Sequence, residues 1–291
     1  MPETGNTIAL KRRIIDTAFQ EEIPERYDLF IFANQEEISC TVAERSEKKF
    51  LALESWDIVN EDYTDAGFLR DLRSESRLLS LKGYPRVVCC TGFHNATLVP
   101  NPLFEAGTAA DQLNFANQPK SDDQILIDQL HQIEASNIYT VPSLIYRNFS
   151  DWFHLAEFHH TSTALIEYLL TVNKNTKEEL LTVNVHRSFV EIIVTRWREL
   201  LLYNHFKYDT PEELIYYLLF VCEQLHLNPD HINVQFAGEI NESDSAFQLS
   251  SKYIRNAGMA VRPESYSYSD SFSELSKQVH FNLFSQIICA S

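Results

Sequence analysis

The stretch of sequence that decides the fold is residues 27–59, YDLFIFANQEEISCTVAERSEKKFLALESWDIV. Its three apolar runs, at 29–33, 38–43 and 50–59, are separated by short polar turns, which is typical of a three-stranded antiparallel meander. Downstream, Thr64 and Asp65 are suited to cap a helix whose apolar positions extend from Phe68 to Leu79, and Gly83 follows as its predicted end. A buried strand is then expected over 86–90. The segment therefore predicts a meander, a helix and a further strand.

The same order of elements returns in the second half of the chain. Three apolar runs precede a predicted helix over 211–225 and a predicted strand that ends at Gly238; the runs cover 181–185, 189–194 and 200–206, and the last strand covers 232–237. Thr210, Pro211 and Glu213 form a helix-start pattern, because the hydroxyl and carboxylate accept backbone N–H groups and proline lacks one. The chain thus predicts the same unit twice.

A segment of a different kind separates the two copies. It reads as strand, helix, strand, strand over 96–99, 102–115, 124–133 and 137–141, followed by a helix, a strand and a helix over 142–152, 155–160 and 162–170. The polar run 173–179 is the predicted linker, and a helix over 244–257 stopped by Gly258 is predicted near the end. We therefore expect an extension over 1–26 that adds a short strand or helix, a first lobe over 27–175 with an insert at 96–141, and a second lobe over 176–291.

Composition excludes several classes of function. The 291 residues carry a formal charge of −17, and a surface this acidic repels phosphate backbones, so we expect no nucleic-acid partner. The longest apolar run, 215–222, is far shorter than the roughly 18 residues that a membrane span requires. Five cysteines without CxxC spacing favour free thiols in a reducing cytoplasm. We expect a cytoplasmic protein without a membrane span.

The repeated unit and several local sequences carry a resemblance to known families. The stretches HHTSTALIE at 159–167, YYLLF at 216–220 and GEI at 238–240 resemble the bacterial family called domain of unknown function 3822. Two meander-helix-strand units with an insert in the first resemble the actin-like ATPase superfamily, in particular its cell-division and pilus-assembly members. The resemblance implies an α/β fold with two ribonuclease-H-like lobes, in which mixed sheets are flanked by helices. It implies no reaction.

The resemblance also implies where a nucleotide would bind. Superfamily members hold ATP phosphates with two glycine-rich hairpins, each preceded by an aspartate, because only a bare backbone comes close enough to the anion. Here Phe32 and Asn34 stand at the aspartate and glycine positions of the first hairpin, and Asn184 and His186 at those of the second. The residues that match this binding region are Asn34, Asn184, His186, Arg187, Ser188, Glu191, Gly238 and Glu239. Seven glycines in the chain, with none between Gly107 and Gly238, leave no other phosphate loop in that span.

Other chemistries depend on individual residues. Arg187 and Ser188 are able to hold a phosphate through their side chains, and Glu191 is able to hold a metal, although a structural turn is favoured. Along a strand, His154 and His160 would lie on one face about 20 Å apart and His159 on the other face, so the three are not expected to share one ion. We expect His159 and His160 to close the strand and cap the next helix. A ribonuclease-H-like nuclease needs carboxylates within strands 29–32 and 87–90, which contain none. No serine or cysteine nucleophile signature is present.

The sequence therefore predicts no catalytic residue, no metal and no cofactor. It favours an actin-like protein without catalysis that acts by binding another protein or itself, with a divergent ATP-binding or kinase-like member as the alternative. Asp128 and Gln132, in the insert, are predicted to face solvent and to border an open strand edge able to accept a partner strand. The competing interpretation is that the insert completes the core of the first lobe.

Overall fold

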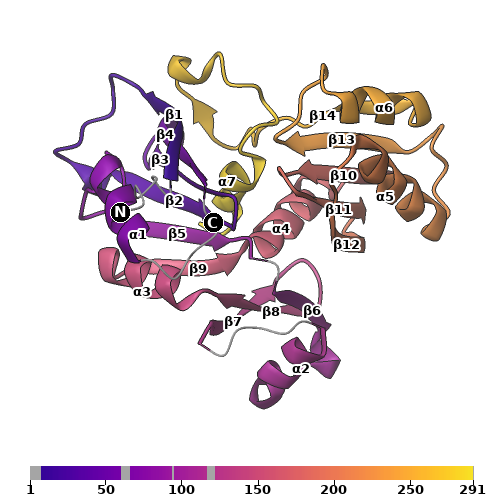
Figure 1. The fold of residues 1–291 in the computed structure, drawn as a ribbon, viewed down its shortest axis with the longest axis horizontal. Coiled ribbons are helices and arrows are strands. Elements are labelled where there is room, and N and C mark those ends of the chain that lie inside the picture. The colour runs from indigo at the N-terminus through magenta and orange to yellow at the C-terminus, as the bar shows by residue number, and fades with distance from the viewer. Residues whose placement is uncertain (1–7, 60–65, 94, 117–121, 291) are drawn as a thin grey trace, which may run out of the picture. The chain divides into compact units, whose positions relative to one another are not determined.

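The structure is a computed structural model, and it describes residues 8–59, 66–93, 95–116 and 122–290 (Figure 1). The chain divides into two compact units. The first contains residues 1–164, 264–274 and 286–291, and the second contains residues 165–263 and 275–285. The last part of the chain thus alternates between the units, because 264–274 and 286–291 belong to the first and 275–285 to the second. The predicted division of the chain at the linker 173–179 did not contain this alternation.

A mixed sheet forms the centre of the first unit. Its strands lie in the order β1-β4-β3-β2-β5-β9, with short β15 beside β4. The strands are β1 (Ile8–Ile15), β2 (Tyr27–Ala33), β3 (Glu37–Glu44), β4 (Lys49–Ile58), β5 (Arg86–Thr91), β9 (Ala156–His160) and β15 (Ser267–Tyr268). The meander β2-β3-β4 is antiparallel, whereas β5 runs parallel to β2 and β9 parallel to β5. The N-terminal extension, expected to add a short strand or helix, adds strand β1, which pairs antiparallel with β4.

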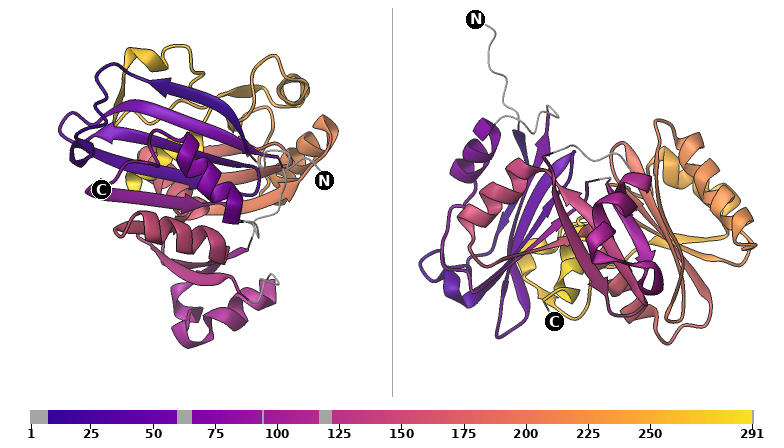
Figure 2. Two further views of the ribbon diagram at one scale, coloured as in Figure 1. Left: turned by 60° about the vertical axis from the view of Figure 1, so that its left-hand side comes forward. Right: turned by 90° about the horizontal axis from the view of Figure 1, so that it is seen from below.

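Two helices cover one face of this sheet. Helices α1 (Ala66–Glu75) and α3 (Ser143–Trp152) lie side by side (Figure 2), and their buried residues share one apolar core with the strands. Helix α1 ends at Glu75, not near Gly83, so the predicted length was wrong. The cause is Glu54, which is fully buried and accepts hydrogen bonds from Ser76 Oγ (2.6 Å) and from the backbone of Leu78 (3.2 Å). These bonds hold Ser76 and the start of the following turn, 77–80, against the sheet.

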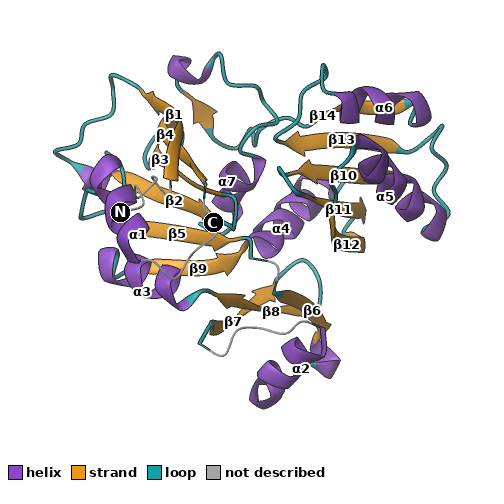
Figure 3. Ribbon diagram, viewed as in Figure 1, coloured by secondary structure: helices purple, strands orange, loops and turns teal. Residues whose placement is uncertain are grey.

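The insert forms a small sheet of its own in the first unit (Figure 3). It contains β6 (Ala96–Pro100), α2 (Ala109–Ala116), β7 (Gln124–Leu130) and β8 (Ala135–Val141), with β8 in the centre and antiparallel to both neighbours. This confirms the predicted order strand, helix, strand, strand. The helix begins at Ala109 instead of Pro102, since two short 3-10 turns, Asn101–Leu103 and Ala106–Thr108, occupy the segment around Gly107.

The second unit repeats the first sheet. Its strand order is β12-β11-β10-β13-β14, with an antiparallel meander β10-β11-β12 and parallel neighbours β13 and β14. The strands are β10 (Glu179–Val185), β11 (Phe189–Arg196), β12 (Glu199–Lys207), β13 (Asn233–Gly238) and β14 (Asn256–Met259), and the helices are α4 (Thr161–Asn173, whose first turn belongs to the first unit), α5 (Pro211–Gln224), α6 (Ser245–Tyr253) and α7 (Phe281–Ser285). The predicted α/β fold of two units with one topology is confirmed.

The sequence predicted the start of helix α5 correctly but the end of helix α6 wrongly. At the start of α5, Thr210 Oγ1 accepts the Glu213 N–H (3.2 Å) and the Glu213 carboxylate accepts the Thr210 N–H (3.3 Å), as the capping pattern predicts. The predicted helix over 244–257 ends at Tyr253, because residues 256–259 pair with β13 as strand β14. Gly258 therefore lies in a strand and does not stop a helix.

Candidate functional site

The first hairpin that the resemblance suggested as a phosphate loop lies between β2 and β3, in the first unit. Asn34 begins this turn and is fully buried. Its Oδ1 atom accepts hydrogen bonds from the backbone N–H groups of Glu36 and Glu37, both at 2.8 Å. An asparagine that accepts the N–H two residues ahead makes a side-chain-closed turn, which imitates a backbone turn. The N–H groups of Glu36 and Glu37 are therefore already bound to the side-chain carbonyl oxygen of Asn34.

The second hairpin joins β10 to β11, in the second unit. The His186 N–H donates to the Phe189 carbonyl (2.9 Å), so the turn itself consists of Arg187 and Ser188, both exposed. The His186 ring is buried and stacks on the Phe189 ring, with centroids 4.0 Å apart and planes 9° from parallel. His186 was expected at a glycine position of a phosphate hairpin; in the structure its ring packs on Phe189, and neither Arg187 nor Ser188 has a positive φ.

Glu191, on β11, is the centre of a buried polar network beside this hairpin. Its Oε2 atom accepts hydrogen bonds from Asn184 Nδ2 (2.7 Å) and Asn282 Nδ2 (3.2 Å) and lies 3.0 Å from His186 Nε2. Its Oε1 atom accepts the Tyr203 hydroxyl at 2.9 Å. Only 2% of Glu191 is exposed. Both carboxylate oxygens are thus bound to side chains of the same unit, and a metal ion would have to displace these donors.

The network sets the charge of this carboxylate. Burial on its own would raise the pKa of Glu191, but the His186 hydrogen bond and charge, with the hydrogen bonds of Tyr203 and Asn282, outweigh burial and lower this pKa to about 2. The site therefore contains a buried anion at neutral pH, paired with the imidazole of His186. Such a carboxylate repels the phosphate groups of a nucleotide.

Gly238, at the end of β13, packs directly against the Asn184 strand. Its φ is +85°, and a Cβ placed on it would lie 2.2 Å from the Val185 carbonyl oxygen. The next residue, Glu239, is exposed, and its N–H donates to the Val185 carbonyl at 2.8 Å. Only glycine fits this position, because it has both a left-handed backbone and a backbone neighbour within contact distance.

The structure brings together most of the residues singled out in the second half and adds partners that the sequence did not reveal. Asn184, His186 and Glu191 form one network, and Gly238 borders it, whereas Asn34 belongs to the other unit. Asn282 and Tyr203 were missed. Asn282 is 98 positions from Asn184 along the chain and carries no local motif, so no sequence signal could have found it.

A second buried polar cluster links the insert to β9 in the first unit. Asp128 Oδ2 accepts the His160 backbone N–H (2.8 Å), and Asp128 Oδ1 lies 3.1 Å from His159 Nδ1. Asp128 is 5% exposed, so its predicted solvent exposure was wrong: alternation along β7 turns Ile127 outward and Asp128 inward. His160 Nδ1 lies 2.7 Å from Ser162 Oγ and accepts the Ser162 N–H, as expected of a histidine that caps α4.

Comparison with protein families places the chain in one of them. The model of the family described as "Protein of unknown function (DUF3822)" matches residues 16–257. The chain belongs to this family. No curated protein matches it.

Solved structures show the same fold. A protein of Bacteroides thetaiotaomicron, described as having an actin-like ATPase fold and unknown function, superposes with a TM-score of 0.73 at 21% identity, over 83% of this chain and 93% of that chain. The PilM-PilN type IV pilus biogenesis complex superposes with a TM-score of 0.56 at 10% identity, over 90% of this chain and 96% of that chain. This DUF3822 chain is therefore an actin-like ATPase-fold protein. None of its described helices combines the length and the apolar character needed to cross a membrane.

Proposed function

We propose that this DUF3822 protein is a non-catalytic member of the actin-like fold that acts by binding another protein. The observation that carries the proposal is that the chain's own side chains occupy the acceptor position of the first hairpin and place a buried carboxylate beside the second. In the first unit Asn34 Oδ1 accepts the turn's N–H groups. In the second unit the buried pair of His186 and Glu191 lies directly beside the turn, with His186 Nε2 and Glu191 Oε2 3.0 Å apart.

Phosphate binding at these hairpins would have an energetic cost. Freeing the two N–H groups from Asn34 removes two hydrogen bonds, each with a net worth of about 1 kcal/mol. A phosphate near Glu191 would approach a buried carboxylate. The actin-like ATPase superfamily uses aspartates to orient metal or water, and Phe32 and Asn184 stand at the positions that we matched to them. Phosphoryl transfer depends on that metal and on an oriented nucleophile, so the proposal excludes turnover.

Thermal unfolding with magnesium and ATP tests the absence of nucleotide binding. We expect the same melting temperature with and without millimolar Mg-ATP. A ligand present at 100 times its Kd stabilises a protein by about 2.7 kcal/mol, which is a measurable upward shift. Such a shift, lost in the Arg187→Ala variant, would favour the divergent ATP-binding alternative instead.

The partner surface is proposed to lie on the insert. Two large apolar side chains are exposed there: Leu103 is 68% exposed and Ile127, on β7, is 39% exposed. Asp128 is unsuitable for a test, because it is buried. The PilM-PilN structure, a complex of two proteins, supports a protein partner for this fold.

Charge substitutions on the insert test this surface. Leu103→Glu and Ile127→Glu are expected to abolish self-association in light scattering, or retention of a partner identified by pull-down, without lowering the melting temperature. Val261→Glu is the matched control, since Val261 is 49% exposed but lies in the second unit. Unchanged association in both insert variants would mean that the partner binds elsewhere.

The proposal also places the protein in the cytoplasm. All five cysteines are free thiols in the structure, as is usual in a reducing compartment. Fractionation of cells carrying a tagged chain is expected to recover it with cytoplasmic proteins, and recovery only in an exported fraction would contradict this location.

A further inference from the structure

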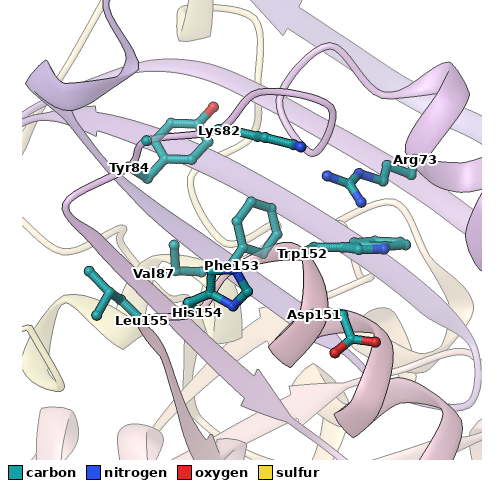
Figure 4. Close-up of a pocket in the computed structure, with 10 residues that line it drawn as sticks. Arg73, Lys82, Tyr84, Val87, Asp151, Trp152, Phe153, His154 and Leu155 are labelled. Atoms are coloured by element: carbon teal, nitrogen blue, oxygen red, sulfur yellow. The ribbon is translucent and has the colours of Figure 1, made fainter.

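A pocket of about 270 Å³ opens in the first unit, and none of the residues that line it belongs to the β2–β3 hairpin (Figure 4). One wall is the segment between α1 and β5, with Lys82 and Tyr84, and the other is the end of α3 and the turn into β9, with Trp152 and Phe153. Its volume is slightly below the roughly 300 Å³ at which drug-sized ligand sites begin. The pocket therefore fits a ligand no larger than a single ring with a short polar arm.

The base of the pocket is apolar and rigid. Phe153 and Tyr84 are both buried, and their rings meet edge to face with centroids 6.2 Å apart. The Tyr84 hydroxyl donates to the Leu78 carbonyl at 3.0 Å, which fixes the ring. Because these side chains are already held by the core, a bound apolar group would not have to order them.

Two cations line the open side. The Arg73 guanidinium lies 5.0 Å from the centre of the Trp152 ring, a stacking contact that holds it in place while its N–H edges remain available. Lys82 is exposed, and Figure 4 shows its ammonium group and the Arg73 guanidinium pointing toward each other. Two like charges that converge repel one another unless an anion lies between them.

The described residues supply no such anion. The ion pairs formed among them include neither Arg73 nor Lys82. Asp151 lines the pocket as well, but in Figure 4 its carboxylate points away from the two cations. In a chain with a formal charge of −17, two converging cations without a carboxylate partner are an unusual arrangement.

We propose that this pocket binds a small organic carboxylate. The carboxylate group would lie between Lys82 and the N–H edge of Arg73, and an apolar or aromatic body would rest on Phe153 and Tyr84. Guanidinium N–H edges match the two oxygens of a carboxylate, and an ammonium adds a point charge beside them. The single negative charge of a carboxylate suits a pocket whose lining, with Asp151 included, carries a net charge of only +1.

The first experiment is a titration with phenylacetate, whose ring and short acid arm match the pocket. Trp152 fluorescence reports binding in a Trp197→Phe background, which removes the exposed tryptophan, while Trp56 is fully buried. The matched probes are phenylacetamide, which lacks the charge, and phenethylamine, which reverses it. We expect phenylacetate to bind at least tenfold more tightly than either. Equal affinities, or no saturable change with phenylacetate, would overturn the proposal.

The second experiment separates the pocket from the general charge of the protein. Lys82→Glu and Arg70→Glu change the net charge equally, and both residues are exposed, but Arg70 does not line the pocket. We expect Lys82→Glu to weaken phenylacetate about tenfold or more, because an attraction becomes a repulsion, and Arg70→Glu to leave the affinity within about twofold. Equal weakening by both variants, at unchanged melting temperatures, would overturn the proposal. Neither result depends on whether ATP binds.

Discussion

At the residue scale, Gly238 is the position where the backbone leaves no choice of side chain. Its φ is +85°, and the Val185 carbonyl oxygen would lie 2.2 Å from any Cβ atom at this position, which excludes every other residue. We expect Gly238→Ala to lower the free energy of unfolding by more than about 2 kcal/mol. Gly258→Ala is the control, since no atom lies within 4 Å of its Cβ position and its φ is not positive, so its effect should stay within about 1 kcal/mol. Urea denaturation measures both, and equal losses would contradict the packing argument.

The pH dependence of stability at Glu191 is a second prediction at this scale. The folded pKa of about 2 lies below the ordinary value of 4.5, so this carboxylate contributes stability above pH 4.5 and loses it as the pH falls toward 2. The contribution at neutral pH is roughly 3 kcal/mol. Glu191→Gln should lower the neutral-pH stability by about 3 to 5 kcal/mol, because it leaves His186 without its charged partner, and should flatten the acid limb.

The control for this measurement is Glu199→Gln. Glu199 begins the adjacent strand β12 and its side chain is 61% exposed, so its substitution is expected to change stability by less than about 0.5 kcal/mol. An acid limb that is as steep in Glu191→Gln as in the parent protein would show that other carboxylates control acid unfolding.

At the element scale, buried Glu54 decides where α1 ends and where β1 attaches. Its carboxylate accepts a hydrogen bond from Ser76 Oγ, just beyond the helix, at 2.6 Å, and one from Arg13 Nε, on β1, at 2.5 Å. Glu54→Gln keeps the shape but removes the charge, so we expect a loss of about 2 kcal/mol and faster amide exchange over 76–79. Glu75→Gln, at an exposed position of the same helix end, should change neither quantity. Exchange over 76–79 that matches the parent protein would mean that the apolar contacts of Leu78 and Leu79 alone fix the turn.

At the scale of the whole molecule, the last residues of the chain serve the two units separately. Residues 286–291 belong to the first unit, where the Arg86 guanidinium donates to the Ala290 carbonyl, while Asn282 belongs to the network of the second. Deleting 286–291 should therefore speed amide exchange in β5 and leave β10 protected, whereas Asn282→Ala should do the reverse. Hydrogen exchange read by mass spectrometry measures both patterns. Equal loss of protection in both units after either change would show that they unfold together.

The sequence alone determined the elements that local chemistry encodes. Alternating or continuous apolar runs fixed both meanders, the capping pattern at Thr210 fixed α5, and the order strand, helix, strand, strand fixed the insert, because each signal lies within a few neighbouring residues. The repetition of these signals was enough to predict two units of one topology. The family was recognisable from short stretches of sequence, which can be compared without knowing any contact between residues.

The tertiary structure decided what depends on residues distant in the chain. The end of α1 depends on Glu54, 22 positions before Ser76, and the burial of Asp128 depends on His160, 32 positions away. The Glu191 network needs Asn282, 91 positions later. A polar side chain becomes buried only where folding supplies its hydrogen-bond partners, since an unpaired buried group costs several kcal/mol. Sequence patterns report periodicity and caps, but those partners exist only once the chain has folded.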